Sequence, residues 1–186
     1  MADAAVTGRP EPCPVRLSDP AAPPPSAIVD RRPALRVVSG GQTGVDRAAL
    51  DAALARGVPV GGWCPAGRWA EDGPVPDRYP LRETGTADPA ERTRLNVRDS
   101  DATLVLAPGP VAGGTALTVE AARALGRPVL VVPPRPDAVG GAVAWVGRGG
   151  VAVLNVAGPR ESEAPGVYDA ALAFVGAVLD RLLSTG

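Results

Sequence analysis

Apolar positions along the chain follow two kinds of pattern. Short continuous runs, rich in valine and leucine, predict buried strands, and segments with apolar residues three or four apart predict helices. The two kinds alternate, which is typical of a parallel sheet covered by helices on both faces, the doubly wound α/β architecture. The strands are predicted at 35–38, 58–62, 102–107, 129–132 and 151–156, and the helices from residue 45 onwards and at 89–99, 115–126, 138–146 and 167–183.

A glycine-rich turn, Ser39–Gly44, joins the first predicted strand to the first helix. Glycines let a backbone come close to a ligand, and the free N–H groups at the start of a helix attract phosphate-like charge. Tight packing is the alternative explanation, because the spacing matches neither standard nucleotide-binding glycine motif. The predicted contacts of an anionic ligand are Gly40, Gly41, Gln42, Thr43 and Gly44, followed by Asp46 and Arg47 in the first helical turn.

A second glycine-rich turn, at 108–115, stands between another strand and its helix. The carboxyl ends of parallel strands lie at one edge of a sheet, where ligands of such folds bind. We therefore expect the two turns to line one crevice, with Gly113, Gly114 and Thr115 offering backbone N–H groups. Arg160, in the turn after the last strand, either reaches this crevice or contacts a partner subunit.

The segment 63–81 has no periodic pattern and is predicted to be irregular. Loops of this length are uncommon in compact domains and are often functional. The segment contains Trp63, Trp69 and Tyr79 together with charged side chains, a combination that suits a planar ligand or a subunit contact. The alternative is a packed loop whose tryptophans seal an edge of the sheet.

Composition narrows the chemistry. The chain has 186 residues, a formal charge of −1 and no histidine, and all 19 basic side chains are arginine. This charge gives no indication of nucleic acid as a partner. The composition therefore excludes catalysis by histidine, Schiff-base formation by lysine and phosphate binding by a P-loop lysine. The two cysteines, Cys13 and Cys64, are too few for a cysteine zinc site, so no metal site is predicted.

Residues 1–33 are rich in proline and alanine and lack periodicity. This composition predicts a disordered tail before a single domain at 34–186. No apolar run approaches the roughly 18 residues of a membrane span, and no signal peptide is visible. The expected location is the cytoplasm, without a membrane partner.

Five motifs together resemble the bacterial proteins known as molybdenum carriers: SGGQTGVDRAALDAAL, GGWCPAGRWAEDGPVP, RTRLNVRDSDATLVL, GGTALTVEAA and LNVAGPRES. The similarity extends from Leu35 to the C-terminus. That family belongs to a Rossmann-like superfamily that also contains the LOG-type phosphoribohydrolases. The resemblance implies a Rossmann-like fold, molybdenum cofactor as a bound ligand, and a homo-oligomer that is a dimer or a tetramer.

The LOG motif runs from a helical arginine, through a Ser-Asp-Ala strand entry, to a glycine block that ends in glutamate. Arg92 stands eight residues before Ser100, as the LOG arginine does, and the segment Gly113–Glu120 has the length of the glycine block. The chain departs from the motif in having Ala-Leu-Thr where LOG proteins have x-Gly-Thr, and its turn is longer. By this resemblance the catalytic positions are Arg92 and Glu120, and the phosphate-loop positions are Gly113, Gly114 and Thr118.

Three functions are consistent with these residues. The chain binds a small phosphorylated, planar, anionic ligand, for which the resemblance suggests molybdenum cofactor. Alternatively, it is a nucleoside 5′-monophosphate N-glycosidase in which Arg92 and Glu120 act on the glycosidic bond. The third function is a nucleotide-sensing module without turnover. For Glu120, an ion pair with Arg123 on the helix surface is the alternative role.

Overall fold

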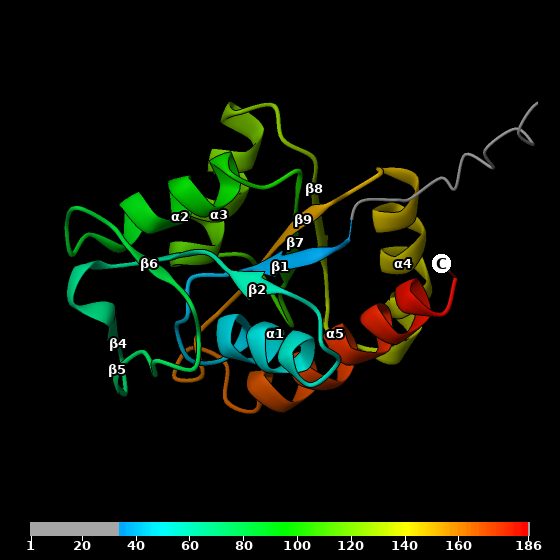
Figure 1. The fold of residues 1–186 in the computed structure, drawn as a ribbon, viewed down its shortest axis with the longest axis horizontal. Coiled ribbons are helices and arrows are strands. Elements are labelled where there is room, and N and C mark those ends of the chain that lie inside the picture. Colours follow the sequence, from blue (N-terminus) through cyan, green and yellow to red (C-terminus); the bar gives the residue numbers. More distant parts are fainter. Residues whose placement is uncertain (1–33, 186) are drawn as a thin grey trace, which may run out of the picture. The chain divides into compact units, whose positions relative to one another are not determined.

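The computed structural model describes residues 34–185, so the tail predicted at 1–33 lies outside the described residues. The centre of the described part is a sheet of five parallel strands in the order β2-β1-β9-β7-β8 (Figure 1). The predicted strands are confirmed, although the second is shorter than expected. The strands are β1 (Arg36–Val38), β2 (Val60–Gly61), β7 (Ala102–Leu106), β8 (Val129–Val132) and β9 (Val153–Ala157).

In this part of the chain, five α-helices cover the sheet, α1, α4 and α5 on one face and α2 and α3 on the other (Figure 1). Asp88 caps α2 as predicted, because its side chain accepts a 2.9 Å hydrogen bond from the N–H of Ala90. None of the helices within residues 34–185 is long and apolar enough to cross a membrane. The helices are α1 (Val45–Leu54), α2 (Pro89–Arg98), α3 (Gly113–Ala124), α4 (Val139–Arg148) and α5 (Val167–Leu183), with short 3-10 turns at Ala66–Arg68 and Pro136–Ala138.

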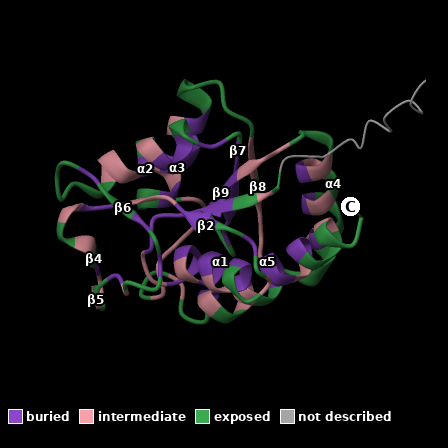
Figure 2. Cartoon of the chain, viewed as in Figure 1, coloured by how far each residue is buried: buried purple, intermediate pink, exposed green. Residues whose placement is uncertain are grey.

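The two faces of the sheet form different cores. Along β7, Leu104 and Leu106 point to the main core beside α1, α4 and α5, so the alternate residues Thr103 and Val105 point to α2 and α3. Beneath α2 and α3, Asn155 of β9 donates a 3.3 Å hydrogen bond to the hydroxyl of Thr103. This second core is therefore partly polar. Figure 2 shows the buried strands between helices whose outer surfaces are exposed.

The segment that follows β2 contains two small two-stranded sheets, so the prediction of an irregular loop at 63–81 is only partly correct. Each of its strands has only two residues, which is too short for a periodic pattern in the sequence. The strand pairs are β3 (Trp63–Cys64) with β6 (Arg82–Glu83), parallel, and β4 (Trp69–Ala70) with β5 (Gly73–Pro74), antiparallel.

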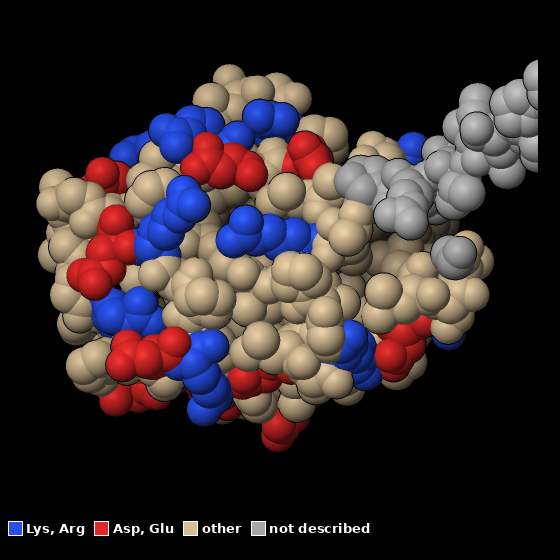
Figure 3. Space-filling model, in the orientation of Figure 1, with Lys and Arg blue, Asp and Glu red and all other residues tan. Residues whose placement is uncertain are grey.

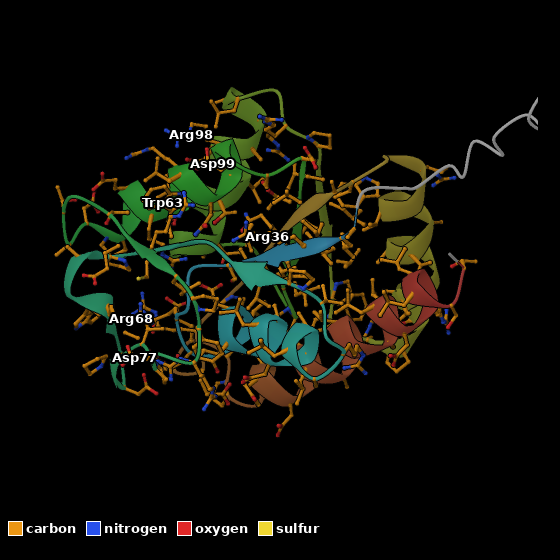
Figure 4. The ribbon with its side chains drawn as sticks, in the orientation of Figure 1. Arg36, Trp63, Arg68, Asp77, Arg98 and Asp99 are labelled. Carbon is orange, nitrogen blue, oxygen red and sulfur yellow. The ribbon has the colours of Figure 1, made fainter. Side chains whose placement is uncertain are left out.

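The guanidinium of Arg68 organises this segment (Figure 4). Its Nε and Nη2 donate 3.0 Å hydrogen bonds to the carbonyl groups of Val75, Pro76 and Tyr79, and its Nη1 donates a 3.3 Å bond to that of Leu81. The backbone of Arg68 has a positive φ of 55°, which a non-glycine residue rarely adopts. Tyr79 is fully buried. These contacts favour the packed-loop explanation of the segment over a ligand surface.

Replacing Arg68 by methionine keeps most of the side-chain volume but removes the donor from four carbonyl groups. Hydrogen bonds from a charged group contribute roughly 1.5–3 kcal/mol each and are not additive. We expect the free energy of unfolding, measured by urea denaturation, to fall by about 3 kcal/mol. The matched control is Arg82→Met in the same segment, where an exposed arginine lies 5.8 Å from the ring of Trp63. This control should lose less than about 1 kcal/mol, and equal losses would contradict the role given to Arg68.

A carboxylate on α1 holds both tyrosines of the chain. The hydroxyl of Tyr79 donates to Asp51 over 2.9 Å, and the hydroxyl of Tyr168, on α5, donates over 2.8 Å. Burial, reinforced by the hydrogen bonds to Asp51, raises the pKa of both phenols, that of Tyr168 to about 12. Neutral phenols therefore connect α1 with α5 and with the segment after β2.

Tyrosine ionisation should be displaced upward in the folded protein. We expect absorbance titration of tyrosinate to place the pKa of Tyr168 near 12, above its ordinary value of 10.0. Because the folded-state pKa exceeds the unfolded one, this contribution to stability is complete below pH 10 and is lost as the pH rises towards 12. Asp51→Asn should lower the pKa of both phenols. Two tyrosines that titrate at their ordinary pKa in the folded protein would rule out this arrangement.

Candidate functional site

The strand order creates a switch point between β9 and β7. These neighbouring strands are followed by helices on opposite faces of the sheet, since α5 follows β9 and α3 follows β7. The connections leave the two carboxyl ends in opposite directions and open a crevice between them, which is where ligands bind in sheets of this kind. The turns at 107–115 and 158–164 form its two walls.

The crevice has a narrow polar part and a wider apolar part. The polar part has a volume of about 40 Å³ and the apolar part about 360 Å³, and Thr115 and Glu163 line both. Gly113 lines the apolar part. The structure brings together these predicted site residues in the polar part: Gln42, Asp46, Arg92, Gly114, Thr115, Thr118 and Arg160.

A buried ion pair joins two of these residues. Nη1 of Arg92, on α2, lies 2.9 Å from Oδ2 of Asp46, on α1, whose side chain is only 3% exposed. Burial raises the pKa of Asp46, against the opposing charge of Arg92 and a hydrogen bond from the N–H of Gln42. Gly40 leaves the space for the guanidinium, because a Cβ at that position would lie 1.6 Å from Nη1. Asp46 therefore positions Arg92, and the need for glycine at position 40 is explained by packing.

We expect removal of one partner of this pair to cost more than removal of both. Arg92→Met leaves the Asp46 carboxyl group buried without its cation, which typically costs about 3–5 kcal/mol of stability. In the double variant Asp46→Asn/Arg92→Met no charge is buried, so part of this loss should be recovered. Urea denaturation of the single and double variants measures the coupling, and strictly additive losses would show that the pair is not energetically coupled.

The first glycine turn is packed against other parts of the chain. A Cβ at Gly44, where φ is 71°, would lie 2.6 Å from the carbonyl oxygen of Pro159. A Cβ at Gly41 would lie 2.6 Å from the side chain of Leu81. The tight-packing explanation thus accounts for these glycines, and neither residue lines the crevice.

Two more of the predicted ligand contacts, Thr43 and Arg47, bind side chains of the turn between β4 and β5 instead. The hydroxyl of Thr43 donates to Glu71, and the guanidinium of Arg47 forms a bidentate pair with Asp72, with an Nη2–Oδ1 distance of 2.7 Å. Although partial burial acts to raise it, the pKa of Glu71 is lowered by hydrogen bonds from Ser162 and Thr43. Thr43, Gly44 and Arg47 line a separate open hollow, away from Arg92.

The second glycine turn has free donors. Gly113 and Gly114 form the first turn of α3, which therefore begins two residues earlier than predicted. Their N–H groups have no hydrogen-bond partner within residues 34–185, and open space lies beside Gly114. The hydroxyl of Thr118, one turn further along, donates to the carbonyl of Gly114 over 3.0 Å. The start of α3 thus presents unpaired N–H groups to the crevice.

Of the two locations predicted for Arg160, the structure shows the crevice. Its Nε lies 3.2 Å from Oε1 of Glu163 and 3.8 Å from Oε2 of Glu71. Sequence reasoning missed Glu163, which lines both parts of the crevice. The available signal was its spacing of three residues from Arg160 in the turn after the last strand.

Glu120 lies outside the crevice. It is exposed on the outer side of α3, in a groove between α2 and α3, and within residues 34–185 it pairs with neither Arg92 nor Arg123. The reason is helical geometry. Thr118 faces the crevice, and a residue two positions later points about 200° around the helix axis.

Residues 37–179 match the family described as "Circularly permutated YpsA SLOG family". The chain belongs to this family. In the sheet of this chain, the last strand along the described residues, β9, lies in the middle, between β1 and β7. In this SLOG protein, one side of the switch point is therefore formed by the last strand, β9, and the turn that follows it, and the other side by β7 and its turn.

A solved structure from Syntrophus aciditrophicus SB, named "Putative molybdenum carrier protein", is similar to this SLOG chain over nearly its whole length. The two share 41% sequence identity with a TM-score of 0.73, and the match covers 81% of this chain and 96% of that chain. No curated protein matches the chain. The resemblance to molybdenum carriers and the Rossmann-like fold are confirmed.

Proposed function

We propose that the chain binds a small phosphorylated ligand with a planar ring system in the crevice between β9 and β7. The observation that carries this proposal is the direct junction of a polar and an apolar cavity at Thr115 and Glu163. A phosphate ester of a flat heterocycle has the same division into a charged end and an apolar end. Pockets with a few convergent polar groups beside apolar walls are typical ligand sites.

The polar part suits the phosphate. Arg92 supplies positive charge from α2 and Arg160 from the turn after β9. The N–H group of Gly114, and that of Gly113 at the border with the apolar part, supply donors at a helix start. The buried Nε of Arg92 has no partner within the described residues. Gln42, Thr115 and Thr118 complete the proposed set, whereas the packed residues Gly40, Gly41, Thr43, Gly44 and Arg47 hold the walls in place.

The apolar part suits the ring system. Its walls are made of proline, alanine and valine side chains, including Pro108, Val111, Pro159 and Ala164. Rigid aliphatic surfaces of this kind can cover the faces of a heterocycle without hydrogen bonds. Recognition of the ring edge would then depend on backbone groups of the two turns and on Glu163.

Molybdenum cofactor, a phosphorylated pterin, is the ligand suggested by the name of the structural relative. Its phosphate and ring fit the two parts of the crevice, and a nucleoside 5′-monophosphate has the same chemistry. Within residues 34–185, no group of three or more His, Cys, Asp or Glu side chains could hold a metal ion. The resemblance also implies a homo-oligomer.

Binding is favoured over N-glycosidase activity by the position of Glu120. Arg92 lines the crevice, whereas Glu120 lines the groove on the outside of α2 and α3, so the two do not act together on one bond in this arrangement. A nucleotide sensor without turnover uses the same contacts as the proposed carrier. Incubation with nucleoside monophosphates tests the enzyme alternative. Release of free base that Glu120→Gln abolishes would restore the catalytic assignment.

Thermal unfolding with a panel of inorganic phosphate, nucleoside monophosphates and a pterin phosphate tests the proposed function. At a ligand concentration about 100-fold above Kd, stabilisation is about 2.7 kcal/mol, which corresponds to a rise in Tm of roughly 5–10 °C for a domain of this size. Arg160→Gln should weaken binding by about 10- to 100-fold, because it removes a charge-assisted hydrogen bond.

The control for this experiment is Arg148→Gln, which removes the same charge from an exposed residue at the end of α4, before β9 rather than after it. It should leave ligand binding unchanged. Absence of stabilisation by every phosphorylated compound would refute the proposed function, and equal weakening by both variants would refute the proposed place of the site.

A further inference from the structure

A carboxylate of the protein itself lies beside the groups that the proposed function assigns to the phosphate. Oε1 of Glu163 lies 3.2 Å from Nε of Arg160, and Oε2 accepts a 3.3 Å hydrogen bond from the N–H of Arg160. A Cβ on Gly113, the first residue of α3, would lie 3.9 Å from the same Oε1. Glu163 therefore holds a negative charge next to both the cation of one wall and the helix start of the other.

The groups around this carboxylate are those that attract anions. The N–H groups of Gly113 and Gly114 are free of partners in the described part of the chain, and the start of a helix favours negative charge. Carboxylates and phosphates are recognised by the same donors, arginine side chains and backbone N–H groups. Glu163 is thus an internal anion at the anion site of the crevice.

The Glu163 side chain is held less firmly than the other carboxylate beside Arg160. It is 45% exposed, and among the described residues its carboxylate binds Arg160 alone. Glu71, whose Oε2 lies 3.8 Å from Nε of Arg160, is only 20% exposed and accepts hydrogen bonds from Thr43 and Ser162. Exposed ion pairs contribute little to stability. An incoming phosphate can therefore displace Glu163 from Arg160, while Glu71 stays in place.

The affinity for anions depends on these few groups. Basic and acidic side chains lie next to one another on the face in view in Figure 3, and the formal charge of the chain is −1. Such a distribution gives little long-range attraction for a phosphate. A change in the partners of Arg160 should therefore appear directly in the affinity of the crevice.

We propose that the Glu163 carboxylate competes with the phosphate for Arg160 and the start of α3, so that a ligand has to displace it. The inference rests on the proposed function, because it concerns the same crevice. Competition by an internal group lowers the affinity for every anion that uses Arg160. A ligand that also fills the apolar part compensates for this loss with the contacts of its ring, whereas inorganic phosphate does not. Glu163 thereby keeps the affinity for phosphate alone low.

Titration calorimetry of the full chain with inorganic phosphate and with adenosine 5′-monophosphate (AMP) tests the proposal. Glu163→Gln keeps the size of the side chain and removes its charge. We expect it to lower both dissociation constants by about 5- to 20-fold, because the competing ion pair and the repulsion between like charges are lost. The matched control is Asp169→Asn, which removes the same charge from an exposed residue in the first turn of α5. It should leave both constants unchanged.

A second comparison distinguishes displacement from simple repulsion. Without the guanidinium of Arg160, the carboxylate has no cation to occupy. In the Arg160→Gln background, Glu163→Gln should therefore tighten AMP binding by less than about 2-fold. A carboxylate that only repels the phosphate would give the same tightening in both backgrounds, and this result would overturn the proposal. Circular dichroism checks that each variant is folded.

Unchanged or weaker binding by Glu163→Gln would also overturn the proposal, but the proposed function would stand, since the crevice would still bind phosphate. Equal tightening by Asp169→Asn would assign the effect to the total charge of the chain and would overturn the proposal in the same way. If neither the wild type nor Glu163→Gln bound inorganic phosphate or AMP, the proposed function would fail and this inference with it. The two failures thus give different results.

Discussion

The ion pair between Asp46 and Arg92 is the contact on which the crevice depends. Asp46 belongs to α1 and Arg92 to α2, and these helices cover opposite faces of the sheet. The pair thus joins the two layers at the carboxyl edge of the strands. A buried carboxylate is costly unless a cation and hydrogen bonds compensate for lost hydration. This cost ties the guanidinium to one place beside the start of α3.

Three turns lie at this edge of the sheet, after β1, β7 and β9, and their contacts differ. The first turn, Ser39–Gly44, is held by contacts with the chain itself, including the close approach of Gly44 to Pro159. Glu71 extends this support, because it accepts hydrogen bonds from Thr43 and from Ser162. The turns after β7 and β9 are left to present donors and apolar walls. Close packing therefore accounts for the glycines of the first turn, whereas open space lies beside Gly114 in the second.

The sequence predicts the elements of this fold better than their arrangement. Apolar runs and helical spacing identify the five central strands and the helices, and Asp88-Pro89 correctly marks the start of α2. The resemblance selects Arg92, and their places next to predicted turns select Asp46 and Arg160; all three line the polar part of the crevice. Strand order is set by contacts between distant residues, so the switch point beside β9 is invisible in local patterns.

The missed features share that origin. Arg68 binds carbonyl groups, which every residue possesses, so no side-chain pattern marks its partners. The motif position of Glu120 gives a residue type and a spacing but not a direction. The direction in which the Glu120 side chain points follows from the residue at which α3 begins and from the orientation of α3 about its own axis. Both depend on the packing of α3 against α2.

The position of β9 also constrains when the crevice can form. The hydroxyl of Ser39 donates to the carbonyl of Val156 over 2.7 Å, between residues 117 positions apart in the sequence. Pairing β1 with β9 requires closure of this long segment. The chain loses conformational entropy on closure before the contacts between the two strands can stabilise the sheet. Arg160 and Glu163 follow β9 directly. The crevice therefore has both of its walls only after the last strand has joined the sheet, so binding of the proposed ligand would report completion of the fold.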